Sequence, residues 1–124
     1  MEIKNDRMYT KSHEWVLFEN DTTATVGLSD FAQSELGDLV FVNLPQVGDA
    51  VTAGETFADV ESVKTVSDVF SPVTGTVAAV NEALNDAPQK INEDAYGAWL
   101  AKVENITGKE ELMDAAAYQA FIEK

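Results

Sequence analysis

The stretch over residues 51–81 constrains the fold more than any other part of the chain. It alternates short apolar, β-prone runs with turn-forming residues, and Gly54, Pro72 and Gly75 separate these runs. Runs of this kind are typical of strands joined by tight turns, because glycine and proline interrupt or bend a ladder of backbone hydrogen bonds. The sequence therefore predicts a mainly β fold whose strands fill the middle of the chain.

Lys64 lies near the centre of this stretch, with Gly54 ten residues before it and Gly75 eleven residues after it. This spacing indicates two similar arms of strand that meet at a turn over residues 63–65. A lysine at the apex of such a turn points into water and away from its own domain. A modifying enzyme could therefore find this lysine by its turn.

Two further β elements are expected before the central stretch. Apolar runs at residues 15–18 and 23–28, separated by residues that tolerate tight turns, predict a hairpin. The run at residues 39–44 is rich in valine, leucine and phenylalanine and ends at Pro45, which cannot continue a ladder. We therefore expect a third strand there.

A short helix is expected near residues 30–36. Ser29 is a suitable N-cap, Asp30 lies in the first turn, and Gly37 is a natural stop. The residues expected to face inward are Phe31, Ala32 and Leu36.

The C-terminal half should hold a connection, a strand and a helix. Residues 81–97 carry asparagine–acid pairs around Pro88 and indicate an irregular surface connection. Alternation of apolar side chains predicts a last strand from Trp99 to Val103. Beyond it, apolar residues recur at the three- and four-residue steps of a helix face, namely Leu112, Met113, Ala116, Ala117, Ala120 and Phe121. We expect one domain over residues 1–124, closed by a helical segment at about 109–123.

The charge of the chain excludes some classes of function. Eight basic residues against 22 acidic ones give a formal net charge of -14, which repels nucleic-acid phosphates and anionic lipids. The acidity serves solubility, steering onto basic partner surfaces, or both. The sequence also contains no run of about 18 apolar residues, the length that a membrane span needs. We expect an unexported, cytoplasmic monomer that binds neither nucleic acid nor membrane.

Independent catalysis is not expected. Without cysteine the chain has no disulfide, no thiolate nucleophile and no cysteine-bound metal centre. Its single histidine, His13, is too little for a histidine metal site and is best interpreted as a hydrogen-bonded structural residue. Trp15 and Trp99 are interpreted as core residues. We therefore predict no catalytic residue and no metal ligand.

Lys64 and its surroundings resemble a known modification site. For an arbitrary surface lysine the default interpretation is a solubilising charge, but Lys64 is framed by acids. The segments Glu61-Ser62-Val63-Lys64, Ser67-Asp68 and Ser71–Gly75 resemble the lipoylation site of glycine cleavage H proteins. The resemblance extends through residues 9–15, 36–42, 81–84 and 112–118, which covers nearly the whole chain.

The resemblance implies both a fold and a function. The fold would be a lipoyl/biotinyl-type barrel-sandwich hybrid with a pseudo-twofold and a lipoyl core at about residues 23–104. Lys64 would carry lipoic acid as lipoyl-lysine, attached by a lipoyl ligase or transferase. The arm would take the aminomethyl group of glycine from a pyridoxal-phosphate glycine decarboxylase to a tetrahydrofolate-dependent aminomethyltransferase, and electrons to an FAD-containing dihydrolipoamide dehydrogenase. The protein would be a non-catalytic carrier.

The resemblance also points to two acids that would shelter the loaded arm, Glu14 and Asp68. For each, the competing interpretation is an ordinary surface carboxylate. The chain departs from the family at Phe31, where many members have histidine or tyrosine, and at residues 94–99, where a shortened loop is expected.

Other carriers match less well, since biotinyl domains set the lysine between two methionines, whereas Val63 and Thr65 flank Lys64 here. Lipoyl domains of 2-oxoacid dehydrogenases are shorter and lack such a C-terminal helix. Two alternatives stay open on the sequence alone. One is an H-like lipoyl relay or a carrier for another pathway, and the other is an unmodified acidic binding module.

Overall fold

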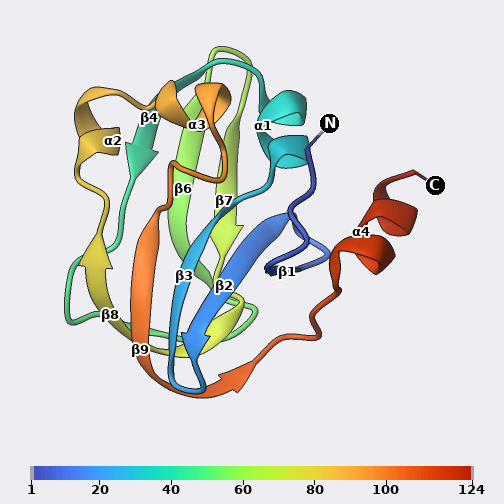
Figure 1. Ribbon diagram of the computed structural model, residues 1–124. Helices are drawn as coiled ribbons and strands as arrows, with labels where there is room; N and C mark the ends of the chain where they lie inside the picture. Colours follow the sequence, from blue (N-terminus) through green and yellow to red (C-terminus); the bar gives the residue numbers. More distant parts are fainter. Residues whose placement is uncertain (1, 124) are drawn as a thin grey trace.

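The computed structural model describes residues 2–123 and contains two antiparallel sheets (Figure 1). The six-stranded sheet has the order β1 (Met8–Tyr9), β2 (Glu14–Asn20), β3 (Thr23–Leu28), β9 (Ala101–Lys109), β8 (Val73–Val80) and β5 (Ala50–Val51). The three-stranded sheet has the order β4 (Leu39–Asn43), β6 (Thr56–Ser62) and β7 (Val66–Phe70). The predicted mainly β fold is confirmed.

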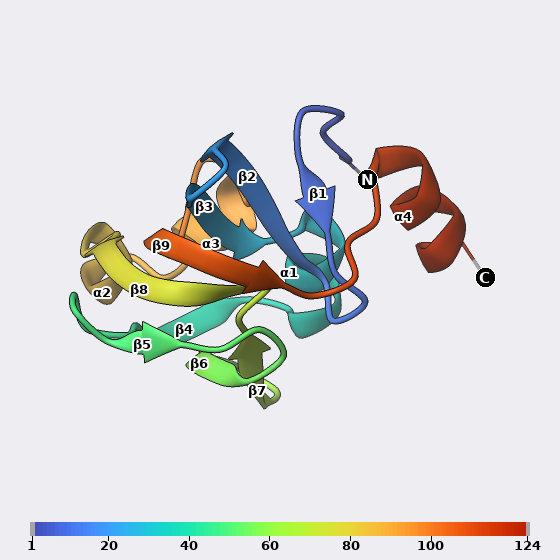
Figure 2. The same ribbon diagram turned by 90° about the horizontal axis from the view of Figure 1, so that it is seen from below.

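The two sheets pack through a shared core. Figure 2 shows β4, β6 and β7 together on one side of β8 and β9, with β2 and β3 on the other. Buried valines fill the space on both sides, among them Val26 and Val103 in the larger sheet and Val42 and Val60 in the smaller one. Phe57 packs against both groups and makes the apolar interior continuous. A one-residue slip would turn these valines away from the core, so their burial fixes the register of the strands that carry them.

The predicted N-terminal hairpin is formed by β2 and β3, which pair from Glu14 with Leu28 to Asn20 with Thr23. The Asn20 side chain accepts a hydrogen bond from the Thr22 amide at 2.9 Å and so closes the turn.

The predicted short helix is α1 (Asp30–Leu36). The Ser29 hydroxyl accepts a hydrogen bond from the Ala32 amide at 3.1 Å, and the chain leaves the helix at Gly37 with φ +83°. Ala32 is buried, whereas Phe31 and Leu36 are half-buried. The local capping signals were therefore sufficient to place both ends of this helix.

The expectation of an irregular surface connection over residues 81–97 is wrong in part. The segment contains two single-turn helices, α2 (Ala83–Asp86) and α3 (Lys90–Glu93). Leu84 and Ile91 are fully buried and pack into the core beside the three-stranded sheet. These turns owe their stability to the burial of one apolar side chain each, because helices of this length are not stable alone.

The C-terminal region also differs from the expectation. Strand β9 continues to Lys109, and the closing helix α4 (Ala115–Ile122) begins after the N-cap Asp114, whose carboxylate accepts the Ala117 amide at 2.8 Å. The predicted apolar face is wrong at its three alanines, whereas its other members, Leu112, Met113 and Phe121, are half-buried and pack against the core. Ala116, Ala117 and Ala120 are exposed, while the buried residues of α4 are Ala115 and Tyr118.

An aromatic cluster holds α4 against the N-terminal strands. The Tyr118 ring stacks on Tyr9, with ring centroids 4.4 Å apart and planes within 4°. The Tyr9 and Met113 backbones exchange two hydrogen bonds of 2.8 Å. Trp15 is buried in the same cluster and donates to the Ala95 carbonyl at 3.1 Å.

Within residues 2–123, no helix is long and apolar enough to cross a membrane. The assignment of residues 1–124 to one lipoyl-carrier domain stays a prediction.

Candidate functional site

Lys64 stands at the tip of the hairpin between β6 and β7, at the upper end of the molecule in Figure 1. The last strand pair before the tip is Glu61 with Val66, and the Ser62 amide donates to the Thr65 carbonyl at 2.8 Å. Lys64 is exposed, as the sequence predicts. The hairpin therefore presents its amine to the solvent.

The buried Ser62 side chain fixes the backbone of this tip. Its hydroxyl oxygen accepts hydrogen bonds from the amides of Lys64 at 3.2 Å and Thr65 at 3.1 Å. The amide of Val63 donates to the Asp38 carbonyl at 3.1 Å. This bond anchors the tip to the short segment that follows α1. The backbone under Lys64 is therefore held from two directions.

The Lys64 side chain itself is lightly held. Its stem lies next to Gly37, because a Cβ on Gly37 would stand 3.3 Å from Lys64 Cε. No carboxylate of residues 2–123 forms a salt bridge with its ammonium group. A fixed backbone with a free amine is the arrangement that a covalently attached swinging group needs.

Asp68 lies on the outer face of the three-stranded sheet. Along this face Asp59 pairs directly with Asp68, and Asn43 donates to the Asp59 carboxylate at 3.0 Å. Directly opposed like charges destabilise a strand pair. The face therefore carries excess negative charge beside the Lys64 hairpin.

Glu14 lies at the start of β2 and is 1% exposed. The Thr10 hydroxyl donates to its Oε1 at 2.7 Å, the Ser12 hydroxyl donates to the same oxygen, and the Phe70 amide donates to Oε2 at 3.3 Å. Burial raises the pKa of Glu14 above its ordinary value, although these hydrogen bonds oppose the shift. Glu14 is thus a buried carboxylate held by neutral donors.

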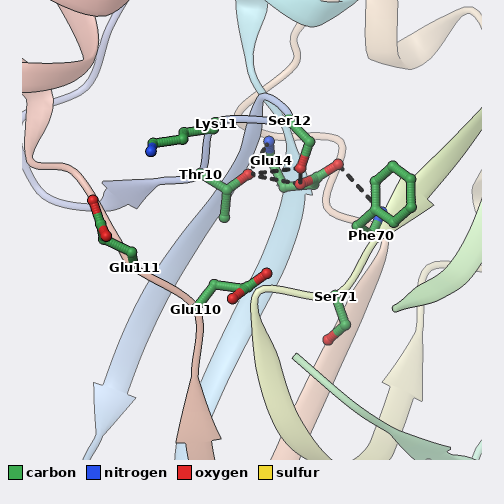
Figure 3. A pocket seen from close by; sticks show the side chains of 8 residues that line it. All are labelled: Thr10, Lys11, Ser12, Glu14, Phe70, Ser71, Glu110 and Glu111. Atoms are coloured by element: carbon green, nitrogen blue, oxygen red, sulfur yellow. Dashed lines mark hydrogen bonds between the residues drawn. The ribbon is translucent and has the colours of Figure 1, made fainter. Parts of the chain in front are cut away.

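Glu14 faces a pocket of about 390 Å³. Figure 3 shows its carboxylate at one wall, with Glu110 directed toward the same space from the segment after β9. The lining residues are Thr10, Lys11, Ser12, Glu14, Phe70, Ser71, Glu110 and Glu111. Oε1 of Glu14 accepts hydrogen bonds from two hydroxyls, whereas Oε2 accepts only the long one from the Phe70 amide. Oε2 therefore has room for a further donor, and the pocket suits a small cation.

The structure brings only one of the two predicted sheltering acids into this pocket. Glu14 lines it, whereas Asp68 does not. Asp68 is two residues before the lining residue Phe70 on β7, so both side chains leave the same face of the strand. Asp68 therefore lies between the Lys64 tip and the pocket along β7, and its role stays a prediction.

His13 makes structural contacts. It is half-buried, its Nδ1 lies 2.8 Å from the Tyr118 hydroxyl, and its ring centroid lies 4.7 Å from that of Phe31. Burial lowers the pKa of His13 below its ordinary value. Trp15 is buried, while Trp99 is half-buried under the Lys102 ammonium group.

Sequence reasoning missed the other seven residues that line the pocket, which are Thr10, Ser12, Lys11, Phe70, Ser71, Glu110 and Glu111. A signal exists for the first two, since hydroxyl residues stand four and two positions before Glu14. Nothing in the local sequence links Phe70 or Glu110 to Glu14. Residues 2–123 contain no group of three histidine, aspartate or glutamate side chains arranged to hold a metal ion.

A β sandwich that presents an exposed lysine at the tip of a hairpin is the arrangement of the lipoyl and biotinyl class of carrier proteins. The family model described as glycine cleavage H-protein matches residues 7–124. The glycine cleavage system H protein of Lachnoclostridium phytofermentans is 58% identical over 124 residues, which cover 100% of this chain and 98% of that protein. The chain belongs to the glycine cleavage H-protein family.

Other relatives agree with this assignment. A probable glycine cleavage system H protein of Pyrococcus abyssi is 51% identical, with 97% of this chain and 92% of the relative covered. The crystal structure of a glycine cleavage system H protein from Mycobacterium marinum matches with a TM-score of 0.91 at 43% identity, covering 98% of this chain and 100% of that one. The predicted lipoyl-type barrel-sandwich fold is thereby confirmed.

Proposed function

We propose that Lys64 Nζ carries lipoic acid in amide linkage and that this arm performs the carrier function of the family. Membership of the H-protein family makes the chain the lipoyl carrier of glycine cleavage. One observation supports the attachment site above all. The Lys64 amide is hydrogen-bonded to Ser62 at 3.2 Å, while the Lys64 side chain is exposed.

The partners that we propose are the other enzymes of the system and the enzyme that attaches the arm. They are the pyridoxal-phosphate glycine decarboxylase, the tetrahydrofolate-dependent aminomethyltransferase, the FAD-containing dihydrolipoamide dehydrogenase and a lipoyl ligase or transferase. When bound, the lipoyl group would supply a disulfide that opens as one sulfur takes up the aminomethyl group of glycine and the other becomes a thiol. This chain contributes attachment, reach and shelter, and its partners contribute catalysis.

Glu14 and Asp68 are proposed to shelter the loaded arm. A buried carboxylate without a cationic partner is costly, and Glu14 is held by neutral hydroxyl and amide donors. A visiting ammonium group would compensate that charge and gain a charge-assisted hydrogen bond. Asp68 adds negative charge on the face of β7 that leads from the tip toward this pocket.

Peptide mapping after treatment with a lipoyl ligase tests the attachment site. We expect one lipoyl group per chain, on Lys64, and none on Lys64→Arg, because a guanidinium is not acylated by the ligase. Lys90→Arg is the matched control, since Lys90 is also exposed. Lipoyl found on another lysine in the parent would contradict the assignment.

Glycine-dependent exchange of carbon dioxide with the purified partners tests the function of the arm. The lipoylated parent and Lys90→Arg should support exchange, and Lys64→Arg should not. A lipoylated parent that supports no exchange would indicate a relay or a carrier for another pathway. An unlipoylated chain in its own cells would indicate a binding module.

A cytoplasmic location and a monomeric state belong to the same proposal. Cell fractionation tests the location, and light scattering tests the oligomeric state.

A further inference from the structure

Tyr118 on α4 connects parts of the chain that are far apart in sequence. It is fully buried, and its hydroxyl lies 2.8 Å from His13 Nδ1 and 2.7 Å from Ser29 Oγ. Stacking on Tyr9 explains the burial of its ring. Stacking does not explain why a hydroxyl is placed between these two partners.

The first partner belongs to the loop that carries Glu14. His13 adopts φ +74°, a left-handed conformation that is unfavourable for a residue other than glycine and persists where the surroundings fix it. Its amide donates to the Thr10 carbonyl at 3.1 Å, and its carbonyl accepts the Ser29 amide at 3.0 Å. Because His13 lies between Ser12 and Glu14, its conformation sets the direction of both pocket side chains.

The second partner belongs to the helix that ends beside Lys64. Ser29 caps α1 by accepting the Ala32 amide. At the other end of α1, the Lys64 stem passes close to Gly37, and the Asp38 carbonyl accepts a hydrogen bond from the Val63 amide. The Tyr118 hydroxyl therefore stands where the pocket loop meets the helix that leads to the base of the arm.

The directions of the hydrogen bonds are consistent along this chain of groups. Burial lowers the pKa of His13 and raises the pKa of Tyr118 to about 12, so the imidazole is neutral and the phenol is protonated near pH 7. Ser29 already accepts the Ala32 amide and is free to donate its hydroxyl proton to Tyr118. In the tautomer that carries its proton on Nε2, His13 accepts the Tyr118 hydroxyl proton at Nδ1, which completes the chain.

We propose that Tyr118 is a positioning residue of the carrier site, whose hydroxyl holds the Thr10–Glu14 loop in register with α1 and so keeps Glu14 directed into the pocket. The inference deepens the proposed function, because it assumes that the pocket receives the loaded arm. It assigns the C-terminal helix a role in the site in addition to packing.

Tyr118→Phe removes the hydroxyl and retains the ring that stacks on Tyr9. Tyr96→Phe is the matched control, because Tyr96 is also a buried aromatic of this cluster and its hydroxyl donates to the Glu2 carbonyl at 2.7 Å, away from the pocket loop. Tyr118→Phe removes the hydrogen bonds of the Tyr118 hydroxyl to His13 and Ser29, whereas Tyr96→Phe removes one hydrogen bond, to the Glu2 carbonyl. A general loss of stability should accelerate amide exchange throughout the chain, whereas loss of the positioning contact should accelerate it in the Thr10–Glu14 loop.

Amide hydrogen exchange of the chain without its lipoyl group tests the positioning directly. The amides of His13 and Glu14 are hydrogen-bonded within the loop, to the Thr10 carbonyl and the Thr10 hydroxyl. We expect their exchange to be about fivefold faster in Tyr118→Phe, as loss of the one neutral hydrogen bond to His13 allows, and unchanged in Tyr96→Phe. Equal exchange in parent and Tyr118→Phe, or equal acceleration in both variants, would overturn the proposal.

A double-mutant cycle tests whether Tyr118 acts through Glu14. Loaded Tyr118→Phe should release formaldehyde and ammonia faster than the parent, whereas adding Tyr118→Phe to Glu14→Gln should produce no further acceleration. Independent, additive effects would overturn the inference. If Glu14→Gln alone leaves release unchanged, the proposed shelter fails, while faster exchange of the loop amides in Tyr118→Phe still supports the positioning.

Discussion

The Lys64 side chain passes close to Gly37 at the end of α1, where a Cβ on Gly37 would stand 3.3 Å from Lys64 Cε. Gly37 combines φ +83° with ψ -164°, a region that residues other than glycine rarely adopt. Glycine at position 37 thus allows this backbone conformation and also leaves space for the Lys64 side chain. Mutation can separate the effect on the backbone from the effect on Lys64.

Gly37→Ala should lower the free energy of unfolding by about 1 to 3 kcal/mol, because alanine is strained in this backbone conformation. Lipoylation of Lys64 should continue, since the nearest atoms belong to a flexible side chain that can move aside. Denaturant unfolding and ligase-dependent lipoylation measure the two effects.

Gly48→Ala is the control for Gly37→Ala, because Gly48 has φ +95° and open space around its Cα. It should also lose stability, without any neighbouring side chain to displace. A Gly37→Ala protein as stable as the parent would contradict the role assigned to its backbone.

Ser62→Ala should loosen the hairpin tip. The Lys64 and Thr65 amides would lose their shared acceptor, at a cost of about 1 kcal/mol in unfolding free energy. Because the ligase needs the tip in one conformation, kcat/KM for lipoylation should fall several-fold. Steady-state kinetics with a lipoyl ligase measures this change.

Ser67→Ala serves as the comparison for Ser62→Ala, since the Ser67 hydroxyl makes one long contact of 3.4 Å to the Asp68 carbonyl on β7. Its lipoylation kinetics should match those of the parent. If both serine variants are modified at the parental rate, the Ser62 bonds do not define the lipoylated conformation.

Local signals in the sequence were sufficient where structure depends on neighbours along the chain. Ser29 and Gly37 bounded α1, and the glycine spacing placed Lys64 at a hairpin tip. The sequence did not predict the single-turn helices α2 and α3, because their stability comes from burial of Leu84 and Ile91 against distant strands. A propensity pattern carries no information about such contacts.

The sequence predicted the exposed lysine at the hairpin tip and singled out one acid that lines the pocket, but it did not predict how the pocket is built. Glu14 followed from a family resemblance, whereas its hydroxyl donors, the facing Glu110 and the Tyr118 contact depend on how distant segments meet. The predicted apolar face of α4 was wrong at its alanines for the same reason. Alanines set its apparent pattern, while Tyr118, stacked on Tyr9, sets its actual buried face.

Glu14→Gln and Asp68→Asn should be lipoylated normally and differ from the parent after loading. Losing a charge-assisted hydrogen bond to the aminomethyl cation costs about 1.5 to 3 kcal/mol, so Glu14→Gln should release formaldehyde and ammonia at least about tenfold faster without the folate enzyme. Asp68→Asn should have a smaller effect, because Asp68 is exposed outside the pocket lining. Equal release from all three proteins would leave both residues as ordinary acids.

Glu14 should also leave a signature in the pH dependence of stability. Burial raises its pKa in the folded protein, so the folded state binds this proton more tightly than the unfolded state does. The stability that comes from this tighter proton binding by Glu14 is therefore fully present below the pKa of the unfolded state, near 4.5. It is lost as the pH rises through the higher pKa of Glu14 in the folded state. The variant Glu14→Gln has an amide at this position, which does not ionise.

The difference in unfolding free energy between the parent and Glu14→Gln should therefore be constant at low pH, where both side chains are neutral. As the pH rises from about 4.5 toward neutrality, the parent should become less stable relative to Glu14→Gln, because only the parent must ionise a buried carboxyl group. Denaturant titrations of both proteins across this range measure the difference, with the low-pH plateau as the internal reference. A difference that stays flat, or shifts in favour of the parent, would show that Glu14 ionises without a desolvation cost, and the buried charge would no longer explain why the pocket should receive a cation.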